Sequence, residues 1–370
     1  MRVLVVNAGS SSVKLSLIGD DQETLAEREV AAPQATVDPA ELREALDGDL
    51  GRADAVGHRI VHGGERFRDP VVIDAGVEQA LRDLVALAPL HQPKSIAAYD
   101  AVSKMLPGIP AVACFDTAFH ATLSPAAYTY ALPHAWRERW GVRRYGFHGL
   151  SHAWIAQRAP QLLTRDASEL RIVSCHLGAG ASLCAIAGGQ SVDTTMGFTP
   201  LEGLVMATRS GSVDPGLLLW LMEQTGMKEL ELARALEHKS GLLGLAGTAD
   251  MRQVIARAGA DDGSAQLALD VYVHRLRAGI GAMAAALGGI DCLAFTGGVG
   301  EHSVEIRAWT AAGLSFLGIE IDARLNAAVA GDAEVSASGA GARAVVIRAR
   351  EDLEIASEVR TLLAGAVDVH

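Results

Sequence analysis

The 370-residue sequence predicts an α/β protein in which one domain plan occurs twice. The first observation is the segment 3–17, where an apolar run gives way to a small-residue turn and then to alternating apolar residues. That pattern is typical of a strand, a tight turn and a second strand. The second observation is a similar segment at 171–185. At roughly 150 residues per domain, the length fits two domains, each opened by one copy.

Both turns consist of small residues, so their backbone N–H groups can approach an anion closely. Superposing the two copies places Gly178 on Gly9 and His176 on Asn7, and Lys14 adds a cation after the first turn. An ordinary polar hairpin would explain one copy alone. The repetition instead predicts two phosphate-binding turns, with a nucleotide between the two halves of the chain.

The composition argues against several classes of partner. Hydrophobic residues make up 49% of the chain and charged residues 21%, as in soluble globular proteins. A net charge of −12 disfavours nucleic acid and anionic membranes. Eight of the twelve histidines lie between His58 and His176, among several arginines, which indicates a small anionic substrate unless these residues are scattered on the surface. The four cysteines lie in apolar contexts and no leader is visible, so we expect a reduced, cytoplasmic protein.

In the first half, apolar periodicity and capping residues predict the elements one by one. They are a strand at 23–31, a helix at 39–47, a strand at 55–61, a helix capped by Asp74, a helix at 94–106 and a strand at 111–115. Arg59 lies within an apolar strand, where burial is costly without an anion, so we interpret it as functional. Asp116 follows a strand, where α/β proteins place chemistry. His91, at a Pro-flanked break, is either a ligand group or a helix cap.

In the second half, the densest cationic and aromatic segment is 143–152, where Gly146 and Gly149 bracket His148 and permit a tight backbone turn. Beyond the second strand–turn–strand, a Gly-rich loop carries Arg209, and long ordered loops are commonly functional. The remaining pattern predicts an amphipathic helix after residue 149, helices at 215–223, 228–238, 249–258 and 264–287, a strand with a Gly-Gly-x-Gly turn at 290–300, a strand at 344–347, and a helix at 352–363 after Glu351.

The sequence contains no Walker A motif, no GxGxxG fingerprint, no GxSxG elbow and no HExxH motif. Its blocks VNAGSSSVK, GHRIVHGGE, LAPLHQP, FDTAFH, RRYGFHGLSH, MGFTPLEG and TGGVGE, which occur in this order over nearly the whole chain, resemble those of the acetate kinase family. This resemblance implies a duplicated two-domain actin-like ATPase fold (ribonuclease H-like), an active cleft between the domains and a homodimer. The implied domains are residues 1–117 with 353–370, and residues 118–352.

The resemblance also implies roles for individual residues. Catalytic residues would be Arg59, His91, Asp116, His148 and Arg209. Acetate would be bound by Arg59, Val61, Leu90, Phe147 and Pro200. ATP or ADP, the co-substrate, would be bound by Ser10, Ser12, Lys14, His176, Leu177, Gly178, Ala179, Gly180, Asp250, Met251, Arg252, Gly297, Gly298, Val299, Gly300 and His302. The metal ion, Mg²⁺ or Mn²⁺, would be bound by Asn7 and Glu351.

Some positions depart from the family pattern. Ala179 replaces the usual Asn of the second turn, which removes a side-chain contact to phosphate but keeps the backbone N–H. His302 stands where an Asn is usual near adenine, and the residues around Glu351 have changed. We therefore expect altered nucleotide affinity and donor preference rather than lost activity.

The expected reaction is ATP + acetate ⇌ ADP + acetyl phosphate, by in-line phosphoryl transfer. Acetate, with a pKa of roughly 4–5 by analogy with Asp and Glu, is ionised at neutral pH and needs no general base. Asp116 would then organise metal and water. One alternative is a kinase for propionate or butyrate. Another is a non-kinase ATPase of the same fold, which the Arg/His cluster disfavours because such a protein needs no site for a second anion.

Overall fold

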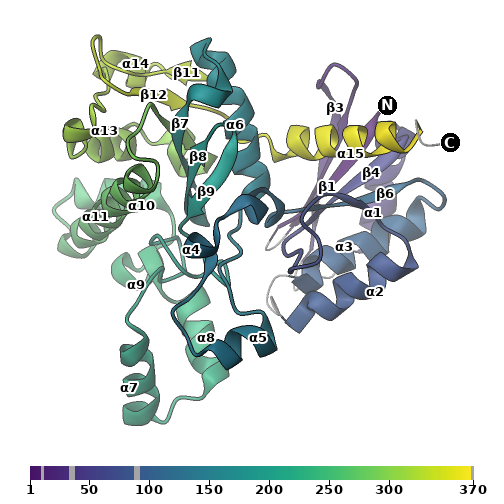
Figure 1. The fold of residues 1–370 in the computed structure, drawn as a ribbon, viewed down its shortest axis with the longest axis horizontal. Coiled ribbons are helices and arrows are strands. Elements are labelled where there is room, and N and C mark those ends of the chain that lie inside the picture. Colours follow the sequence, from purple (N-terminus) through teal and green to yellow (C-terminus); the bar gives the residue numbers. More distant parts are fainter. Residues whose placement is uncertain (10–11, 33–37, 87–91, 368–370) are drawn as a thin grey trace. The chain divides into compact units, whose positions relative to one another are not determined.

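The computed structural model describes residues 1–9, 12–32, 38–86 and 92–367, and the chain forms two compact units. Unit 1 consists of Met1–Ala121, Phe147–Trp154 and Arg350–His370, and unit 2 of Thr122–Gly146 and Ile155–Ala349. Each unit is built on one six-stranded sheet (Figure 1). No helix within the described ranges combines the length and apolarity that a membrane crossing requires.

The sheet of unit 1 has the strand order β3-β2-β1-β4-β6-β5. Its strands are β1 (Val3–Ala8), β2 (Ser12–Ile18), β3 (Thr24–Ala31), β4 (Ala55–Ile60), β5 (Val71–Val72) and β6 (Ala111–Phe115). The strands β1, β4 and β6 are parallel neighbours, whereas β2 runs antiparallel to both β1 and β3. The five strands predicted here are confirmed. The edge strand β5 was missed because two residues leave no periodic pattern.

Unit 2 repeats this plan with β7 (Arg171–Leu177), β8 (Ala181–Ala187), β9 (Gln190–Thr194), β10 (Cys292–Thr296), β11 (Ala333–Glu334) and β12 (Arg343–Val346). Its order, β9-β8-β7-β10-β12-β11, matches unit 1 strand for strand. Gly9 and Gly178 occupy the same place after the first strand, and their N–H groups donate across the turn to Ser12 and Gly180, both at 2.8 Å. The predicted duplication is therefore confirmed.

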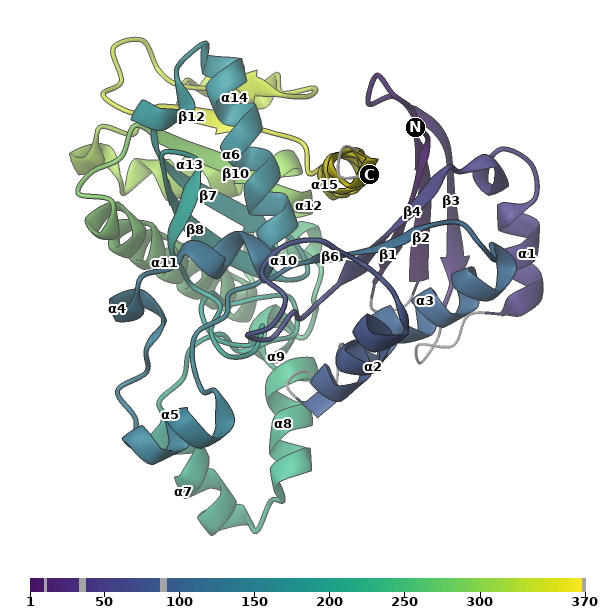
Figure 2. The same cartoon turned by 45° about the vertical axis from the view of Figure 1, so that its right-hand side comes forward.

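Helices surround both sheets (Figure 2). They are α1 (Pro39–Leu46), α2 (Ala75–Asp83), α3 (Gln92–Met105), α4 (Pro125–Tyr128), α5 (His134–Trp140), α6 (Gly149–Leu163), α7 (Pro215–Thr225), α8 (Glu229–His238), α9 (Gly241–Ala246), α10 (Met251–Ala258), α11 (Gly263–Ala286), α12 (Gly297–His302), α13 (Val304–Ala312), α14 (Ala323–Ala327) and α15 (Glu351–Val367). Short 3₁₀ turns are η2 (Leu50–Arg52), η3 (Leu84–Ala86), η4 (Ala118–Thr122), η5 (Ala167–Glu169) and η6 (Ser315–Leu317). Asp74 caps α2 as predicted, because its carboxylate accepts a hydrogen bond from the Val77 N–H.

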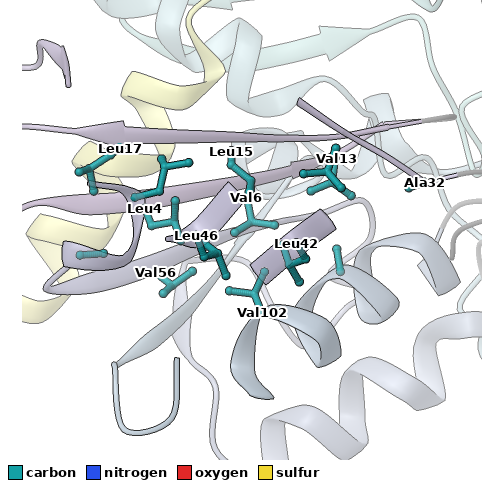
Figure 3. Close-up of a cluster of buried hydrophobic side chains, with 14 residues drawn as sticks. Leu4, Val6, Val13, Leu15, Leu17, Ala32, Leu42, Leu46, Val56 and Val102 are labelled. Atoms are coloured by element: carbon teal, nitrogen blue, oxygen red, sulfur yellow. The ribbon is translucent and has the colours of Figure 1, made fainter. Parts of the chain in front are cut away.

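Both faces of the unit 1 sheet are covered by helices, which explains why its first strand begins as a continuous apolar run. On one face of the unit 1 sheet, Leu4 and Val6 pack against α1 and α3 (Figure 3). On the other face, Val3 and Val5 pack against α15, so the last helix belongs to unit 1. In unit 2, α11 lies close to β8, because a Cβ on Gly279 would come within 2.7 Å of the Leu183 side chain.

Candidate active site

Three predicted site residues meet at one edge of the unit 1 sheet. Asn7 and Arg59 lie near the carboxyl ends of β1 and β4, and Asp116 directly follows β6. These strands are parallel neighbours, so their carboxyl ends lie at the same edge. Ligands of open α/β sheets commonly bind at this edge.

Arg59 is the centre of a hydrogen-bonded cluster that Asn7, Asp116 and Glu351 complete. Its Nε donates to Asp116 Oδ1 at 2.9 Å and its Nη2 to Asp116 Oδ2 at 2.6 Å, a bidentate ion pair. Its Nη1 donates to Asn7 Oδ1 at 3.0 Å and lies 3.7 Å from Glu351 Oε2, which accepts from Asn7 Nδ2 at 3.2 Å. Three of the five guanidinium N–H groups of Arg59 donate to described residues. Arg59 therefore retains donors for an anionic ligand.

The cluster is partly buried and contains two carboxylates and one guanidinium. Asp116 is only 2% exposed, and its burial raises its pKa above the ordinary value even though Arg59 opposes the shift. Burial lowers the pKa of Arg59, but the carboxylates of Asp116 and Glu351 outweigh that effect and raise it above its usual range. Arg59 is therefore charged at neutral pH. Because Arg59 occupies both oxygens of Asp116, this carboxylate is poorly suited to act as a general base.

His148 lies in an unusual backbone turn of unit 1. Its φ is +56°, in the left-handed region, and Gly146 before it has a φ of +78°. The N–H of Gly149 donates to the carbonyl oxygen of Asp116 at 2.8 Å, and a Cβ on Gly149 would lie 2.2 Å from that oxygen. The predicted need for glycine beside His148 is thus met, and the turn is tied to the backbone of Asp116.

The residues expected to bind the acetate methyl lie on different parts of the chain. Phe147 is buried in unit 1, and its ring meets the His62 ring edge-on with centroids 5.5 Å apart. Val61 is half-buried in unit 1 and Pro200 is buried in unit 2. Leu90 lies outside the described residues, as do His91 and Ser10.

Arg209 lies in unit 2, on the loop between β9 and α7. Its Nη1 donates to the carbonyl oxygen of Pro200 at 2.7 Å, and its Nε lies 3.8 Å from Glu237 Oε2 on α8. Glu237 is only 8% exposed, and burial raises its pKa although Arg209 opposes the shift. Sequence reasoning missed Glu237, because apolar periodicity does not identify an acidic residue on the buried side of a helix.

A cavity of about 590 Å³ in unit 2 contains eight of the predicted nucleotide-binding residues. They are Gly178, Ala179, Asp250, Met251, Arg252, Gly298, Val299 and His302. The prediction missed other lining residues, namely Ala207, Leu242, Ala249, Ile255, Tyr272, Ser303 and Glu305. The volume is within the range of roughly 300–1,000 Å³ that is usual for small-molecule sites.

Strand pairing explains why these residues meet. Because β7 and β10 are parallel neighbours, the turn after β7 lies beside the Gly-rich start of α12. Gly297 has a φ of +76°, and a Cβ there would lie 2.8 Å from the carbonyl oxygen of Leu177. Gly298 has open space where a Cβ would be, so its backbone can face a ligand. Of the predicted residues in unit 2, five do not line the cavity, namely His176, Leu177, Gly180, Gly297 and Gly300.

Several predicted polar residues already have protein partners. In unit 1, Ser12 Oγ donates to Glu29, and Lys14 Nζ lies 3.1 Å from a carboxylate oxygen of Glu27. In unit 2, Arg143 stacks over the ring of Tyr128, and Arg144 donates to Glu202 Oε1 at 2.7 Å. The arginines at 143 and 144 therefore hold protein structure together, which the count of cationic residues could not reveal.

No group of three or more His, Cys, Asp or Glu side chains in the described part of the chain is arranged to hold a metal ion by itself. Asn7, Asp116 and Glu351 nevertheless bring hard oxygen atoms together beside Arg59. Mg²⁺ prefers such oxygens, usually keeps several waters and takes further ligands from substrate phosphates. This donor set therefore fits a magnesium ion that also binds a nucleotide.

Comparison with known proteins identifies the family. The family model described as "Acetokinase family" matches residues 36–357. An acetate kinase from Synechococcus sp. is 45% identical, over 99% of this chain and 100% of that protein. The crystal structure of Porphyromonas gingivalis acetate kinase is similar with a TM-score of 0.90 at 37% identity, covering 98% of this chain and 99% of that one. A propionate kinase from Francisella tularensis has a TM-score of 0.88 at 33% identity, covering 96% and 98%. The chain therefore belongs to the acetokinase family.

Proposed function

We propose that this protein catalyses ATP + acetate ⇌ ADP + acetyl phosphate. The observation that carries the proposal is the partly buried Arg59 cluster, in which a guanidinium is fixed at the carboxyl edge of a sheet and retains donors for an anion. The full-length similarity to acetate kinases supports acetate as the acceptor. The cavity of about 590 Å³ in unit 2 supports a nucleotide as the donor.

The proposed chemistry is a direct in-line transfer. A carboxylate oxygen of acetate attacks the γ-phosphorus of ATP, the bond from that phosphorus to the β–γ bridging oxygen breaks, and ADP leaves with the electron pair. Acetate carries no proton to remove at neutral pH, because carboxylic acids of this kind have a pKa of roughly 4–5. The bidentate pairing of Asp116 with Arg59 supports a role for Asp116 as an organiser rather than as a base.

The main barrier is the repulsion between two anions. We assign Arg59 and Arg209 to the acetate carboxylate and the transferring phosphoryl group, and His148 to a hydrogen bond with that group in the transition state. An arginine placed in this way can contribute about 10³-fold or more to the rate. His91 is proposed as a further neighbour. The proposed methyl pocket consists of Val61, Leu90, Phe147 and Pro200.

Mg²⁺, or Mn²⁺ in its place, is the proposed metal ion. Asn7 and Glu351 would hold it, with Asp116 acting through water, and their hard oxygens support this choice. When bound, it would neutralise part of the negative charge on the ATP phosphates. The proposed nucleotide contacts comprise Ser10, Ser12, Lys14 and residues 176–180 toward the phosphates, and 250–252, 297–300 and His302 toward the adenosine.

A kinase for propionate or butyrate is the second candidate, because a propionate kinase is also similar over nearly the whole chain. A panel of acetate, propionate and butyrate, with the acyl phosphate trapped as its hydroxamate, separates the two. We expect kcat/KM to be about tenfold or more higher for acetate, since one methylene in a closely fitting pocket is worth roughly 10–200-fold. Equal values would refute acetate as the preferred acid. ATP hydrolysis that needs no acid would instead support the non-kinase ATPase.

We also propose a cytoplasmic homodimer with the functional domains 1–117 plus 353–370 and 118–352. The helix α7 supports the dimer, because it is largely apolar and yet contains no buried residue. Leu219 is 70% exposed and Trp220 54%, which is typical of a surface that a partner covers. The four cysteines are buried free thiols, in keeping with a reducing compartment.

A further inference from the structure

The loop that connects β9 to α7 carries both Pro200 and Arg209, and its first part forms no helix or strand. Three side chains of unit 2 hold it: Tyr130, Arg144 and Glu202. We call these three residues the loop clamp. None of them belongs to the proposed catalytic or nucleotide-binding set.

Glu202 is the centre of the clamp, because each of its carboxylate oxygens accepts a different donor. Oε1 accepts from Arg144 Nη2 at 2.7 Å, and Oε2 accepts from the hydroxyl of Tyr130. The Tyr130 hydroxyl in turn accepts from the backbone N–H of Phe198 at 3.0 Å. Arg144 Nη1 also donates to the carbonyl oxygens of Thr194, Thr195 and Met196. Backbone donors and acceptors of the loop are thus fixed by side chains far away in the sequence.

Gly197 shows how closely the clamp fits. A Cβ at this position would lie 1.8 Å from Glu202 Oε2 and 2.1 Å from the Tyr130 hydroxyl, so no side chain can be added there without displacing the clamp. The carbonyl oxygen of Gly197 accepts from the N–H groups of Tyr145 at 3.1 Å and Gly146 at 3.3 Å. The clamp is therefore tied to the segment that continues directly into Phe147 and His148.

Pro200 lies between two points that the clamp fixes, namely Phe198 and Glu202. Its carbonyl oxygen accepts from Arg209 Nη1 at 2.7 Å, so the position of this guanidinium depends on the position of Pro200. We propose that the loop clamp is a positioning device that sets Pro200, and through it Arg209, and thereby determines which short carboxylic acid the enzyme prefers. This inference rests on the proposed acyl kinase function and specifies how its acid selectivity arises.

Loosening the clamp should change the selectivity for the acid and leave the binding of ATP largely unchanged. In the loop between β9 and α7, it is Ala207 that lines the cavity of about 590 Å³. It is fixed independently, because its N–H donates to the Ala179 carbonyl at 3.2 Å and its own carbonyl accepts from the Leu243 N–H at 3.0 Å. Loosening the loop near Pro200 therefore leaves the anchoring of Ala207 intact.

Tyr130→Phe tests the proposal, because it removes one hydroxyl, and with it the bonds to Glu202 and Phe198, while keeping the ring. We expect the ratio of kcat/KM for propionate to that for acetate to rise about tenfold, a change of the size that one methylene usually makes. The KM for ATP should stay within about twofold, since no nucleotide contact is lost. Tyr128→Phe is the matched control, since Tyr128 stacks on Arg143 and its hydroxyl has no bond to the clamp. It should leave the ratio unchanged.

Glu202→Gln keeps the shape of the side chain and removes its charge, so it is measured in the same way and also serves if Tyr130→Phe fails to fold. In the double variant we expect a smaller change than the two single changes combined, because the residues act as one unit. Equal losses of activity on both acids, with an unchanged ratio in either folded variant, would reduce the clamp to a stability element and overturn the proposal. A wild-type enzyme that phosphorylates no short acid would refute the proposed function instead.

Discussion

At the scale of single residues, the free-energy cost of burying a guanidinium identifies Arg59 as a candidate site residue. A guanidinium in an apolar strand needs compensation, and the structure supplies it through Asp116, Asn7 and Glu351. The sequence indicated that an anion was needed, but not that two carboxylates of the chain itself would provide part of it. Glu351 lies nearly 300 residues from Arg59 in sequence, so no local pattern connects the two.

Arg59→Ala should lower kcat by about 10³-fold, because it removes the donor that we propose for the charged transition state. Binding of ATP, followed as a nucleotide-induced rise in Tm, should remain measurable. The change also leaves Asp116 buried without its partner, which costs roughly 3–5 kcal/mol of stability, so Arg59→Lys is measured in parallel. Arg66→Ala, which removes an arginine stacked on Phe67, is the control and should be near wild type. A near-wild-type kcat in both Arg59 variants would remove Arg59 from the mechanism.

Glu358 on α15 should make stability depend on pH. Burial raises its pKa to about 8, with Glu354 and Asp116 adding to the shift and the Cys114 thiol opposing it. From about pH 4.5 to 8 the unfolded chain has lost this proton while the folded chain keeps it, so the free energy of unfolding falls as the pH rises. The expected loss is on the order of 5 kcal/mol across that range.

Glu358→Gln should therefore flatten this slope and stabilise the protein above neutral pH. Urea unfolding at several pH values between 5 and 8.5 measures the effect. If the variant and the wild type lose stability in parallel as the pH rises, Glu358 does not carry the charge-burial cost assigned to it.

At the scale of elements, the start of α6 depends on a glycine. A Cβ on Gly149 would lie 2.2 Å from the carbonyl oxygen of Asp116, whereas a Cβ on Gly281 of α11 would meet no atom within 4 Å. We expect Gly149→Ala to destabilise the protein by about 1–3 kcal/mol and to reduce activity, because the turn at His148 must shift. Gly281→Ala should stabilise it by roughly 0.5–1 kcal/mol, since alanine favours a helix interior.

The two variants are compared with the wild type by their Tm in thermal unfolding and by their kcat. Equal Tm values for Gly149→Ala and the wild type would show that the close contact with Asp116 does not constrain this turn.

Apolar periodicity predicted the central strands and most longer helices, because buried parallel strands leave continuous apolar runs. It missed the short edge strands β5, β9 and β11 and the helices α4, α5, α9, α13 and α14.

Part of the candidate site was also predictable, since Arg59 and Asp116 lie at strand ends. Partners such as Glu237 and Glu202 were not, because contacts between residues tens of positions apart are set by the folded chain. Arg144 and Glu202, for example, are 58 residues apart.

At the scale of the whole molecule, duplication gave two equivalent sheets with different chemistry. The edge of the unit 1 sheet carries a charged cluster around Arg59. The corresponding edge of the unit 2 sheet carries glycine-lined turns and a cavity of about 590 Å³. The same strand order thus supports a charged cluster in one copy and a candidate nucleotide pocket in the other.

The exposed apolar helix α7 leads to a prediction about assembly. Sedimentation velocity of the wild type should give twice the chain mass of 38.7 kDa. Leu219→Glu should shift the protein to the monomer, because it places a charge on a face that we propose is buried between subunits. Leu25→Glu, at a residue 46% exposed on β3 of unit 1, is the control and should stay dimeric. A monomeric wild type, or a Leu219→Glu dimer as stable as the wild type, would rule out α7 as the interface.

The most direct test is a single turnover with γ-labelled ATP, Mg²⁺ and acetate, in which labelled acetyl phosphate is separated directly from ATP and from free phosphate. We expect the label to reach the acetate carboxylate in the wild type, to be transferred far more slowly in Arg59→Ala, and to remain in ATP when acetate is omitted. Release of the label as free phosphate at the same rate with or without acetate would contradict the proposed kinase reaction.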